Sequence, residues 1–330
     1  MLGNRHLKAE AVWHNHSRRA IKNKDHPSFA VHHPNFRGEP WRYTPRPGTS
    51  PVALLYFHVG KCAGGSVVNW LERQNPRFTM KLAYGMAPLF LGLFPAHFPT
   101  HARRWGTSRP DWRNESIFVE FHAWAEGFYL VDVLPELSDL RAEYRAVGGR
   151  LVTFTTLRDP ASHIISFYEM WPTLTCNGTR SCSRASFARF LPDAVGLQTR
   201  ILAGPKVRLK FPIPAYRRET QHPNGMFPCN EAHTERALST LRSFDVIGFT
   251  SNLSAATDQV ESCTGLWMPR RVPHKSERHT AFVTEEERAD PAIQAAIRAA
   301  AACDIQLHQM MLRHLGTGTC GAVGARAGLQ

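Results

Sequence analysis

Hydrophobic residues in the first half of the chain predict three buried strands. Apolar runs occupy 52–58, 116–121 and 151–157, and each is short and rich in β-branched or aromatic side chains. After the first run, apolar positions recur with a helical period and predict a helix over 64–74. After the third run, Pro160 occupies a position typical of the first residue of a helix. The predicted unit is therefore a strand, a turn and a helix, repeated.

The second half of the chain is predicted to be mostly helical. Asn230, Thr284 and Asp290 each precede a helical pattern and are typical N-cap residues. The last of these helices is expected to run without a break from residue 291 to Gly316. One further strand is predicted over 244–249.

Alternating strands and helices are typical of a doubly wound parallel sheet. The predicted fold class is α/β, with a P-loop-like doubly wound parallel sheet flanked by helices and a helical C-terminal part. A helix over 136–147 fits this pattern, whereas 76–115 carries no clear pattern. Residues 1–50 are basic and without periodicity, and we expect a flexible tail or stem there. Residues 51–330 then form the folded domain.

Composition narrows the class of partner. The chain has 330 residues, of which 43% are hydrophobic, enough for one large core. Its formal net charge of +13 indicates an anionic partner such as an acidic polysaccharide, a membrane surface or nucleic acid. The basic residues are dispersed and lack the interleaved aromatic residues of an RNA-binding sheet. We therefore expect no nucleic-acid partner.

Seven cysteines show no Cys-x-x-Cys spacing, so no metal site is expected. Cys176 and Cys182 bracket a polar turn and are the favoured disulfide pair, ahead of Cys263 with Cys303. Asn177, between the first pair, is the favoured glycosylation site among four sequons.

Two turns that follow predicted strands have the composition of phosphate sites. The first is Val59-Gly-Lys-Cys-Ala-Gly-Gly-Ser66, where free backbone N–H groups and a helix dipole favour an anion and Lys61 adds a positive charge. The second is Arg158-Asp-Pro, with Ser166 eight residues after the arginine. Two such sites predict a ligand that is phosphorylated at both ends.

Both motifs resemble those of carbohydrate (heparan-sulfate-type) sulfotransferases, where they bind the two ends of PAPS, 3′-phosphoadenosine 5′-phosphosulfate. Segments beginning at Gly196, Phe244 and Asp304 are similar to later segments of the same family. The resemblance implies a sulfotransferase domain over 51–330 that uses PAPS as co-substrate, requires no metal, and transfers a sulfuryl group to a hydroxyl of a glycan or acidic polysaccharide. The donor-binding residues that it implies are Gly60, Lys61, Cys62, Ala63, Gly64, Gly65, Ser66, Val67, Arg158, Ser166, Lys275 and Ser276.

The resemblance also implies catalytic roles. Lys61 would balance the charge that builds on the bridging oxygen as the donor bond breaks. The acceptor hydroxyl needs a base, for which the resemblance favours His122. Glu120 lies on the same face of the predicted strand. It is alternatively the base itself, a residue that orients His122, or a buried structural carboxylate.

Three positions depart from the family's pattern. Gly60 replaces a usual proline, and Gly65 replaces a threonine whose hydroxyl contacts the phosphate, for which Ser66 can substitute. His163 replaces a frequent arginine. Because it is expected on a helix face away from Ser166, this change is predicted to be tolerated.

Eukaryotic members of the family are commonly held in the Golgi by one N-terminal helix, so the Golgi lumen or membrane is the expected location. No stretch of the chain approaches the roughly 20 apolar residues needed to cross a bilayer, and its start lacks the apolar core of a signal peptide. Membrane attachment would therefore require an anchor that is missing from this chain.

Two other functions fit parts of the sequence. A P-loop nucleotide kinase also has a strand, a glycine turn and a helix, but its lysine follows the glycines, whereas Lys61 precedes Gly64. A polyanion-binding protein with the same fold and an inactive donor site would use the basic surface alone.

Overall fold

The computed structural model describes residues 50–73, 80–82, 87–94, 96–98, 116–122, 129–170, 187–188, 190–203, 230–265 and 283–314. All of them belong to one compact unit, Tyr43–Gln330. Several sequence predictions concern positions outside the described residues, namely the tail over 1–49, Cys176, Asn177, Cys182, Lys275 and Ser276.

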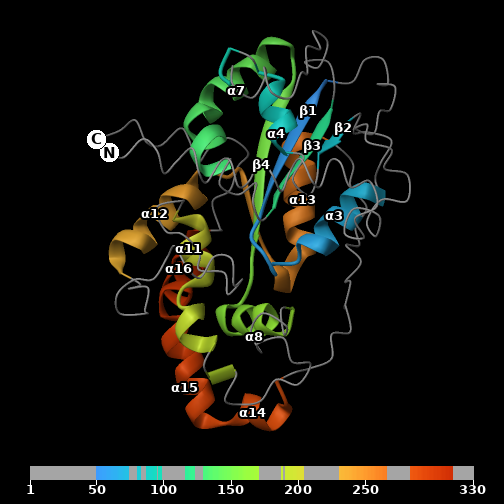
Figure 1. The fold of residues 1–330 in the computed structure, drawn as a ribbon. Helices are drawn as coiled ribbons and strands as arrows, with labels where there is room; N and C mark the ends of the chain where they lie inside the picture. The colour runs from blue at the N-terminus through green and yellow to red at the C-terminus, as the bar shows by residue number, and fades with distance from the viewer. Residues whose placement is uncertain are drawn as a thin grey trace, which may run out of the picture. The chain divides into compact units, whose positions relative to one another are not determined.

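Five parallel strands form one sheet in the order β2-β3-β1-β4-β5 (Figure 1). This parallel sheet confirms the α/β class. The strands are β1 (Val52–His58), β2 (Met80–Leu82), β3 (Ile117–His122), β4 (Arg150–Leu157) and β5 (Val246–Phe249).

The central strand β1 is buried along its whole length. Leu55 and Phe57 face one core cluster, whereas Leu54 and Tyr56 face another on the opposite side of the sheet. A strand covered on both faces needs apolar residues at every position. This is why β1 and β4 appear in the sequence as continuous apolar runs.

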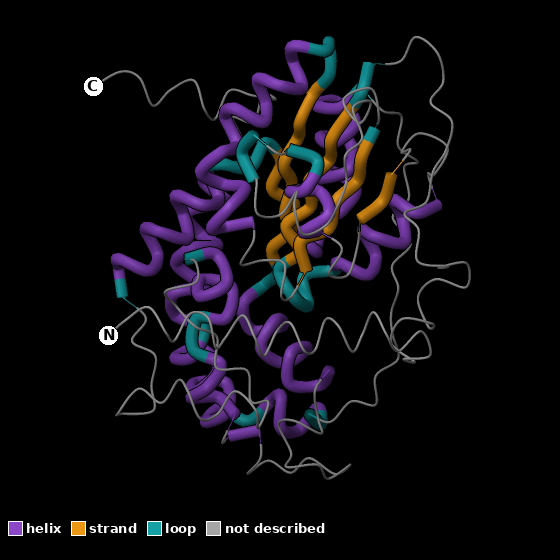
Figure 2. Tube along the Cα trace, turned by 45° about the horizontal axis from the view of Figure 1, so that its top comes forward, coloured by secondary structure: helices purple, strands orange, loops and turns teal. Residues whose placement is uncertain are grey.

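Helices cover both faces of the sheet (Figure 2). One core cluster joins the sheet to α3 and α13, and the other joins it to α4, α7 and α12. These helices are α3 (Gly64–Arg73), α4 (Ala87–Gly92), α7 (Leu134–Ala146), α12 (Glu231–Arg242) and α13 (Leu253–Thr264).

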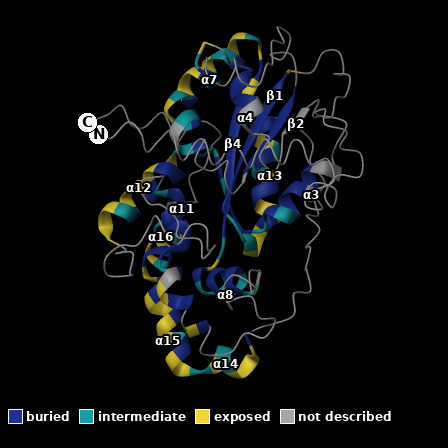
Figure 3. Cartoon of the chain, in the orientation of Figure 1, coloured by how far each residue is buried: buried dark blue, intermediate teal, exposed yellow. Residues whose placement is uncertain are grey.

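A third core cluster lies among helices beyond the sheet, and the outward sides of α14 and α15 are exposed (Figure 3). The helical C-terminal part of the prediction is therefore confirmed. The remaining helices are α8 (Pro160–Met170), α11 (Leu197–Leu202), α14 (Glu285–Ala289), α15 (Pro291–Ala300) and α16 (Ala302–His314), with short turns η3 (Tyr129–Val133), η4 (Leu191–Ala194) and η5 (Thr250–Asn252).

The predicted helix N-caps are present. The Asn230 side chain accepts the His233 N–H, Thr284 forms a capping box, and Asp290 accepts two N–H groups of the first turn of α15. Asn252, which lies in one of the four sequons, accepts the Ala255 N–H and caps the start of α13.

Two segments of the chain differ from the prediction. The single C-terminal helix is broken at Ala301, where α15 ends and α16 begins. The Ala300 carbonyl accepts the Gly196 N–H at 2.9 Å, a contact between distant segments that no local pattern reveals. Within 76–115, β2 and α4 are present although the sequence did not predict them. Both are too short for a periodic pattern to reveal.

In the described part of the chain, no helix combines the length and apolar character required to span a bilayer. Cys263 and Cys303 are both disulfide-bonded. Cys62, in contrast, is a buried thiol.

Candidate functional site

The carboxyl ends of β1 and β4 lie side by side where the connections of the sheet diverge. From β1 the chain crosses to β2 at one edge, whereas from β4 it continues to β5 at the opposite edge. Ligands of open parallel sheets bind beyond the strand ends at such a point. Lys61 and Arg158 follow these two strands closely, so the sheet order brings both motifs to this place.

Loop 59–63, between β1 and α3, contains two residues in the left-handed backbone conformation. They are Lys61, with φ of 64°, and Ala63, with φ of 63°. Neither is glycine, so each costs about 1–2 kcal/mol relative to the right-handed conformation. Alternating conformations of this kind direct successive N–H groups toward one side and form a concave anion site. The strain is therefore an observation that points to a ligand.

The carbonyl groups of loop 59–63 all accept hydrogen bonds from within the protein. The donors come from the loop itself, the first turn of α3, β4, the residue after it, and α8. In chain order the pairs are Val59 O with Cys62 N (3.1 Å), Gly60 O with His163 Nε2 (2.7 Å), Lys61 O with Arg158 Nη1 (3.2 Å), Cys62 O with Thr156 Oγ1 (2.6 Å), and Ala63 O with Ser66 N (2.9 Å) and Val67 N (3.0 Å).

The N–H groups of the same turn are disposed differently. Among the described residues, the N–H groups of Ala63, Gly64 and Gly65 donate no hydrogen bond. The first N–H groups of a helix have no partner within the helix, and α3 begins here. The turn thus presents donors while its carbonyl groups are engaged elsewhere, which is the polarity that a phosphate requires.

Of the predicted donor-binding positions 60–67, some serve the turn itself. The N–H groups of Cys62, Ser66 and Val67 are used in the turn. The Val67 side chain lies in the core beneath α3, and Ser66 is buried. Cys62 is buried and its thiol donates to Gln198 Oε1 at 3.5 Å, which suits a packing role and not nucleophilic attack.

The Gln198 side chain holds the backbone of Arg158. Its Oε1 accepts the Arg158 N–H at 3.0 Å, and its Nε2 donates to the Arg158 carbonyl at 2.9 Å. Gln198 is in turn positioned by Asp304 on α16, which accepts the N–H groups of Gln198 (3.2 Å) and Thr199 (2.8 Å) at the start of α11. Burial raises the pKa of Asp304, and the hydrogen bonds from Thr199 oppose that shift.

The second motif also shapes α8. Asp159 Oδ1 accepts the Ser162 N–H at 2.8 Å and so caps this helix. Ser166 lies within α8 and is partly buried. Arg158 is partly buried too, and its guanidinium contacts the first loop.

His58, the last residue of β1, lies directly beneath the start of α3. Its Nδ1 lies 2.6 Å from Glu120 Oε1 on β3, and its ring stacks on Tyr56 with centroids 5.4 Å apart. A Cβ added to Gly64 would lie 1.6 Å from His58 Nε2. Burial lowers the pKa of His58 to about 3, and the charge of Lys61 acts in the same direction. The imidazole is therefore neutral at neutral pH.

The two alternative bases are both on β3. His122 is the last residue of β3, and the backbone of His122 pairs in register with that of His58. The structure describes the backbone of His122 but not its side chain. Glu120 is fully buried, and its carboxylate contacts His58.

The structure places His163, a position where the sequence departs from the family's pattern, against the first loop. It is fully buried, and its Nε2–H donates to the Gly60 carbonyl at 2.7 Å. Burial lowers the pKa of His163 to about 4, and the nearby charges of Arg158 and Lys61 act in the same direction.

Sequence reasoning did not assign roles to His58, Thr156 and Gln198. Each is a buried polar residue within an apolar segment, and such residues need hydrogen-bond partners. That signal marks the residues but does not identify the partners, because the contacts join positions from 40 to about 100 residues apart.

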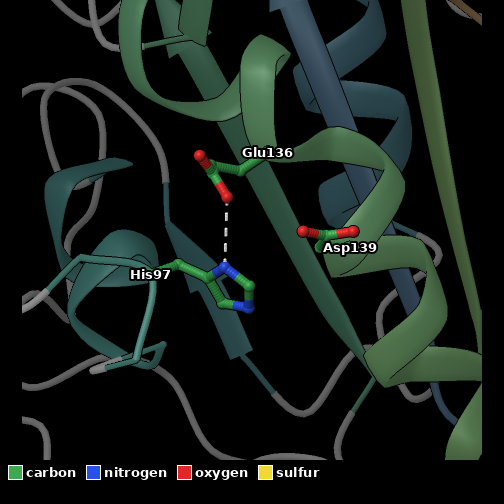
Figure 4. Close-up of side chains that lie close together, drawn as sticks. All are labelled: His97, Glu136 and Asp139. Atoms are coloured by element: carbon green, nitrogen blue, oxygen red, sulfur yellow. Dashed lines mark hydrogen bonds and ion pairs between the residues drawn. The ribbon is translucent and has the colours of Figure 1, made fainter.

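A separate group of ligand atoms lies between α7 and the segment 96–98. One atom each from His97, Glu136 and Asp139 lies within 4.8 Å of the others (Figure 4). His97 also bonds Glu143 through Nε2 at 2.6 Å. Burial lowers the pKa of His97, but the hydrogen bonds to Glu143 and Glu136 raise it further, so that it lies above its ordinary value. The two carboxylates that contact this imidazole favour its protonated form.

Comparison of the chain with protein-family models, with curated proteins and with solved structures found no match.

Proposed function

We propose that this protein is a sulfotransferase that moves a sulfuryl group from PAPS to a hydroxyl of a carbohydrate. The observation that carries this proposal is the polarity of the first turn. Its carbonyl groups all accept hydrogen bonds, its N–H groups at positions 63–65 donate to no acceptor in the described part of the chain, and a lysine and an arginine flank it. A P-loop-like phosphate site at the strand ends has this form.

The two motifs suit one nucleotide with phosphates on both sides of its ribose. The N–H groups of Ala63, Gly64 and Gly65 would bind the 5′-phosphate, and Lys61 would lie beside it. Arg158 and Ser166 would bind the 3′-phosphate, for which a planar guanidinium is well suited. The contact of 3.2 Å between Arg158 and the Lys61 carbonyl supports a shared ligand, because it joins the two motifs directly.

In the proposed reaction, the acceptor hydroxyl oxygen forms a bond to sulfur while the bond from sulfur to the 5′-phosphate oxygen breaks. The acceptor proton passes to a base, and 3′,5′-ADP leaves. Lys61 stabilises the negative charge that develops on the leaving oxygen. We place the base at His122, because Glu120 has no exposed surface and already contacts His58.

The acceptor class and compartment follow from charge and cysteine chemistry. A formal net charge of +13 favours an acidic glycan as the acceptor. Disulfide-bonded Cys263 and Cys303 fit an oxidising compartment such as the Golgi lumen.

The test is a calorimetric titration of the whole chain with 3′,5′-ADP, alongside adenosine, 5′-AMP and Mg-ATP. We expect saturable binding of 3′,5′-ADP without metal, weaker binding of 5′-AMP, and none of adenosine. Absence of 3′,5′-ADP binding would refute the sulfotransferase proposal and favour the alternative of a polyanion-binding protein. Tight, magnesium-dependent binding of ATP would instead favour the kinase.

Lys61→Ala tests the assigned chemistry. Because this lysine is proposed to act on developing charge, turnover with labelled PAPS and a desulfated polysaccharide should fall by at least about a hundredfold, whereas the dissociation constant for 3′,5′-ADP should change by less than about fivefold. Arg158→Gln is the matched variant. It should weaken binding of 3′,5′-ADP more than it slows turnover. Undiminished turnover by Lys61→Ala would refute its role.

A further inference from the structure

His163 joins the helix of the second motif to the loop of the first. It lies on α8, in the same helix as Ser166, and its Nε2–H donates to the Gly60 carbonyl at 2.7 Å. A carbonyl oxygen can only accept, so the ring proton must reside on Nε2. The ring has no exposed surface. One side chain thus connects two segments that the proposed function assigns to different phosphates.

The same ring has a buried nitrogen that the protein does not satisfy. Within the described residues, His163 Nδ1 has no hydrogen-bond partner and no exposed surface. Burying an acceptor in this way is unfavourable by about 1–3 kcal/mol. If the residue served only to fill the core, an apolar side chain of similar size would stabilise the fold more. Its presence therefore calls for a role outside folding stability.

We propose that His163 is a positioning residue that keeps the Gly60 carbonyl away from the 5′-phosphate and thereby couples the loop to α8. This inference rests on the proposed function. Gly60 has no Cβ, and an added one would meet nothing within 4 Å, so side-chain packing does not restrict the backbone of this residue. Without the bond from His163, the peptide can rotate and direct its oxygen toward the anion, which would repel it.

The proposal predicts a selective defect. Loss of the bond should weaken recognition of the 5′-phosphate and leave recognition of the 3′-phosphate intact, because Arg158 is held separately by Gln198. It should not lower the free energy of unfolding, since the unsatisfied nitrogen is removed at the same time. If His163 were needed only for packing, its loss would weaken recognition of both phosphates equally and would lower the free energy of unfolding.

The experiment compares His163→Leu with His163→Gln, whose side-chain amide can donate in place of Nε2. His233→Leu on α12 is the control. Dissociation constants are measured for 5′-AMP, 3′-AMP and 3′,5′-ADP, and stability by urea denaturation. For His163→Leu we expect about five- to tenfold weaker binding of 5′-AMP and 3′,5′-ADP, unchanged 3′-AMP binding and undiminished stability. His163→Gln should restore affinity to within about twofold of wild type.

Three results would overturn the proposal. Unchanged binding of all three nucleotides by His163→Leu would do so while leaving the proposed function in place. An equal loss for 3′-AMP and 5′-AMP, accompanied by lower stability, would show a structural role only. A wild-type protein that binds none of these nucleotides would remove the proposed function and this inference together.

Discussion

Gly64 and Gly65 are adjacent in sequence but stand in different surroundings. A Cβ at position 64 would overlap the His58 ring, which is buried and bonded to Glu120, so the ring cannot readily move aside. A Cβ at position 65 would meet nothing within 4 Å. Neither glycine has a positive φ. The first glycine is therefore needed for space, and the second is not.

The expected consequence is a large difference between two similar substitutions. Gly64→Ala should lower the free energy of unfolding by about 2–3 kcal/mol, because a buried ring must shift. Gly65→Ala should leave it unchanged or raise it by up to about 1 kcal/mol, because alanine favours the helix. Urea denaturation measures both. Equal stabilities of the two variants would contradict this account of the His58 packing.

Among the elements, α11 connects the C-terminal helices to the site. Asp304 on α16 holds the first turn of α11, and from that turn Gln198 bonds both backbone groups of Arg158. The C-terminal helices thus reach the backbone of Arg158 through the Gln198 amide. This explains why sequence segments near residues 158, 198 and 304 contribute to one structure.

Gln198→Ala tests the connection between α11 and Arg158. Two backbone groups of Arg158 would lose their partners, so the free energy of unfolding should fall by about 1–3 kcal/mol. The dissociation constant for 3′,5′-ADP should rise about tenfold because the arginine is no longer held. Gln309→Ala, at an exposed position of α16, is the matched control and should change neither quantity. Wild-type affinity in the Gln198 variant would argue against the connection.

The elements also show what a sequence can and cannot reveal. β1 and β4 could be predicted because both of their faces are buried, and the N-caps at Asn230 and Asp290 because a cap is a local contact. The break at Ala301 could not, since it accompanies a hydrogen bond to Gly196. For the candidate site, the sequence predicted Lys61 and Arg158, and the structure brings their two segments into contact. The residues that hold them in place depend on which strands are neighbours.

At the scale of the whole molecule, two buried histidines link stability to pH. Burial lowers the pKa of His58 to about 3 and that of His163 to about 4, whereas both titrate near 6.5 in an unfolded chain. Below pH 6.5 the unfolded state therefore binds more protons than the folded state. The stability that these groups confer is complete above that pH and is lost as the pH falls toward the folded-state values.

Urea denaturation at pH 7.5, 6.0 and 5.0 measures this loss. Each histidine contributes a slope of up to about 1.4 kcal/mol per pH unit. His163→Leu removes one of them, so its curve should be shallower than that of wild type by that amount, with the contributions of other groups cancelling in the difference. Parallel curves would mean that His163 is not neutral and buried in the folded protein.

The loop that follows β1 begins in the central strand of the sheet and is bonded to its neighbour β4. Because its carbonyl groups are bonded to β4, α8 and the start of α3, the loop should lose its conformation mainly when the sheet opens as a unit. An anion bound to the loop would then raise the free energy of unfolding of the whole fold by an amount set by the anion's concentration and affinity. A melting-temperature screen of small anions against the intact chain would report on this loop without any assay of turnover.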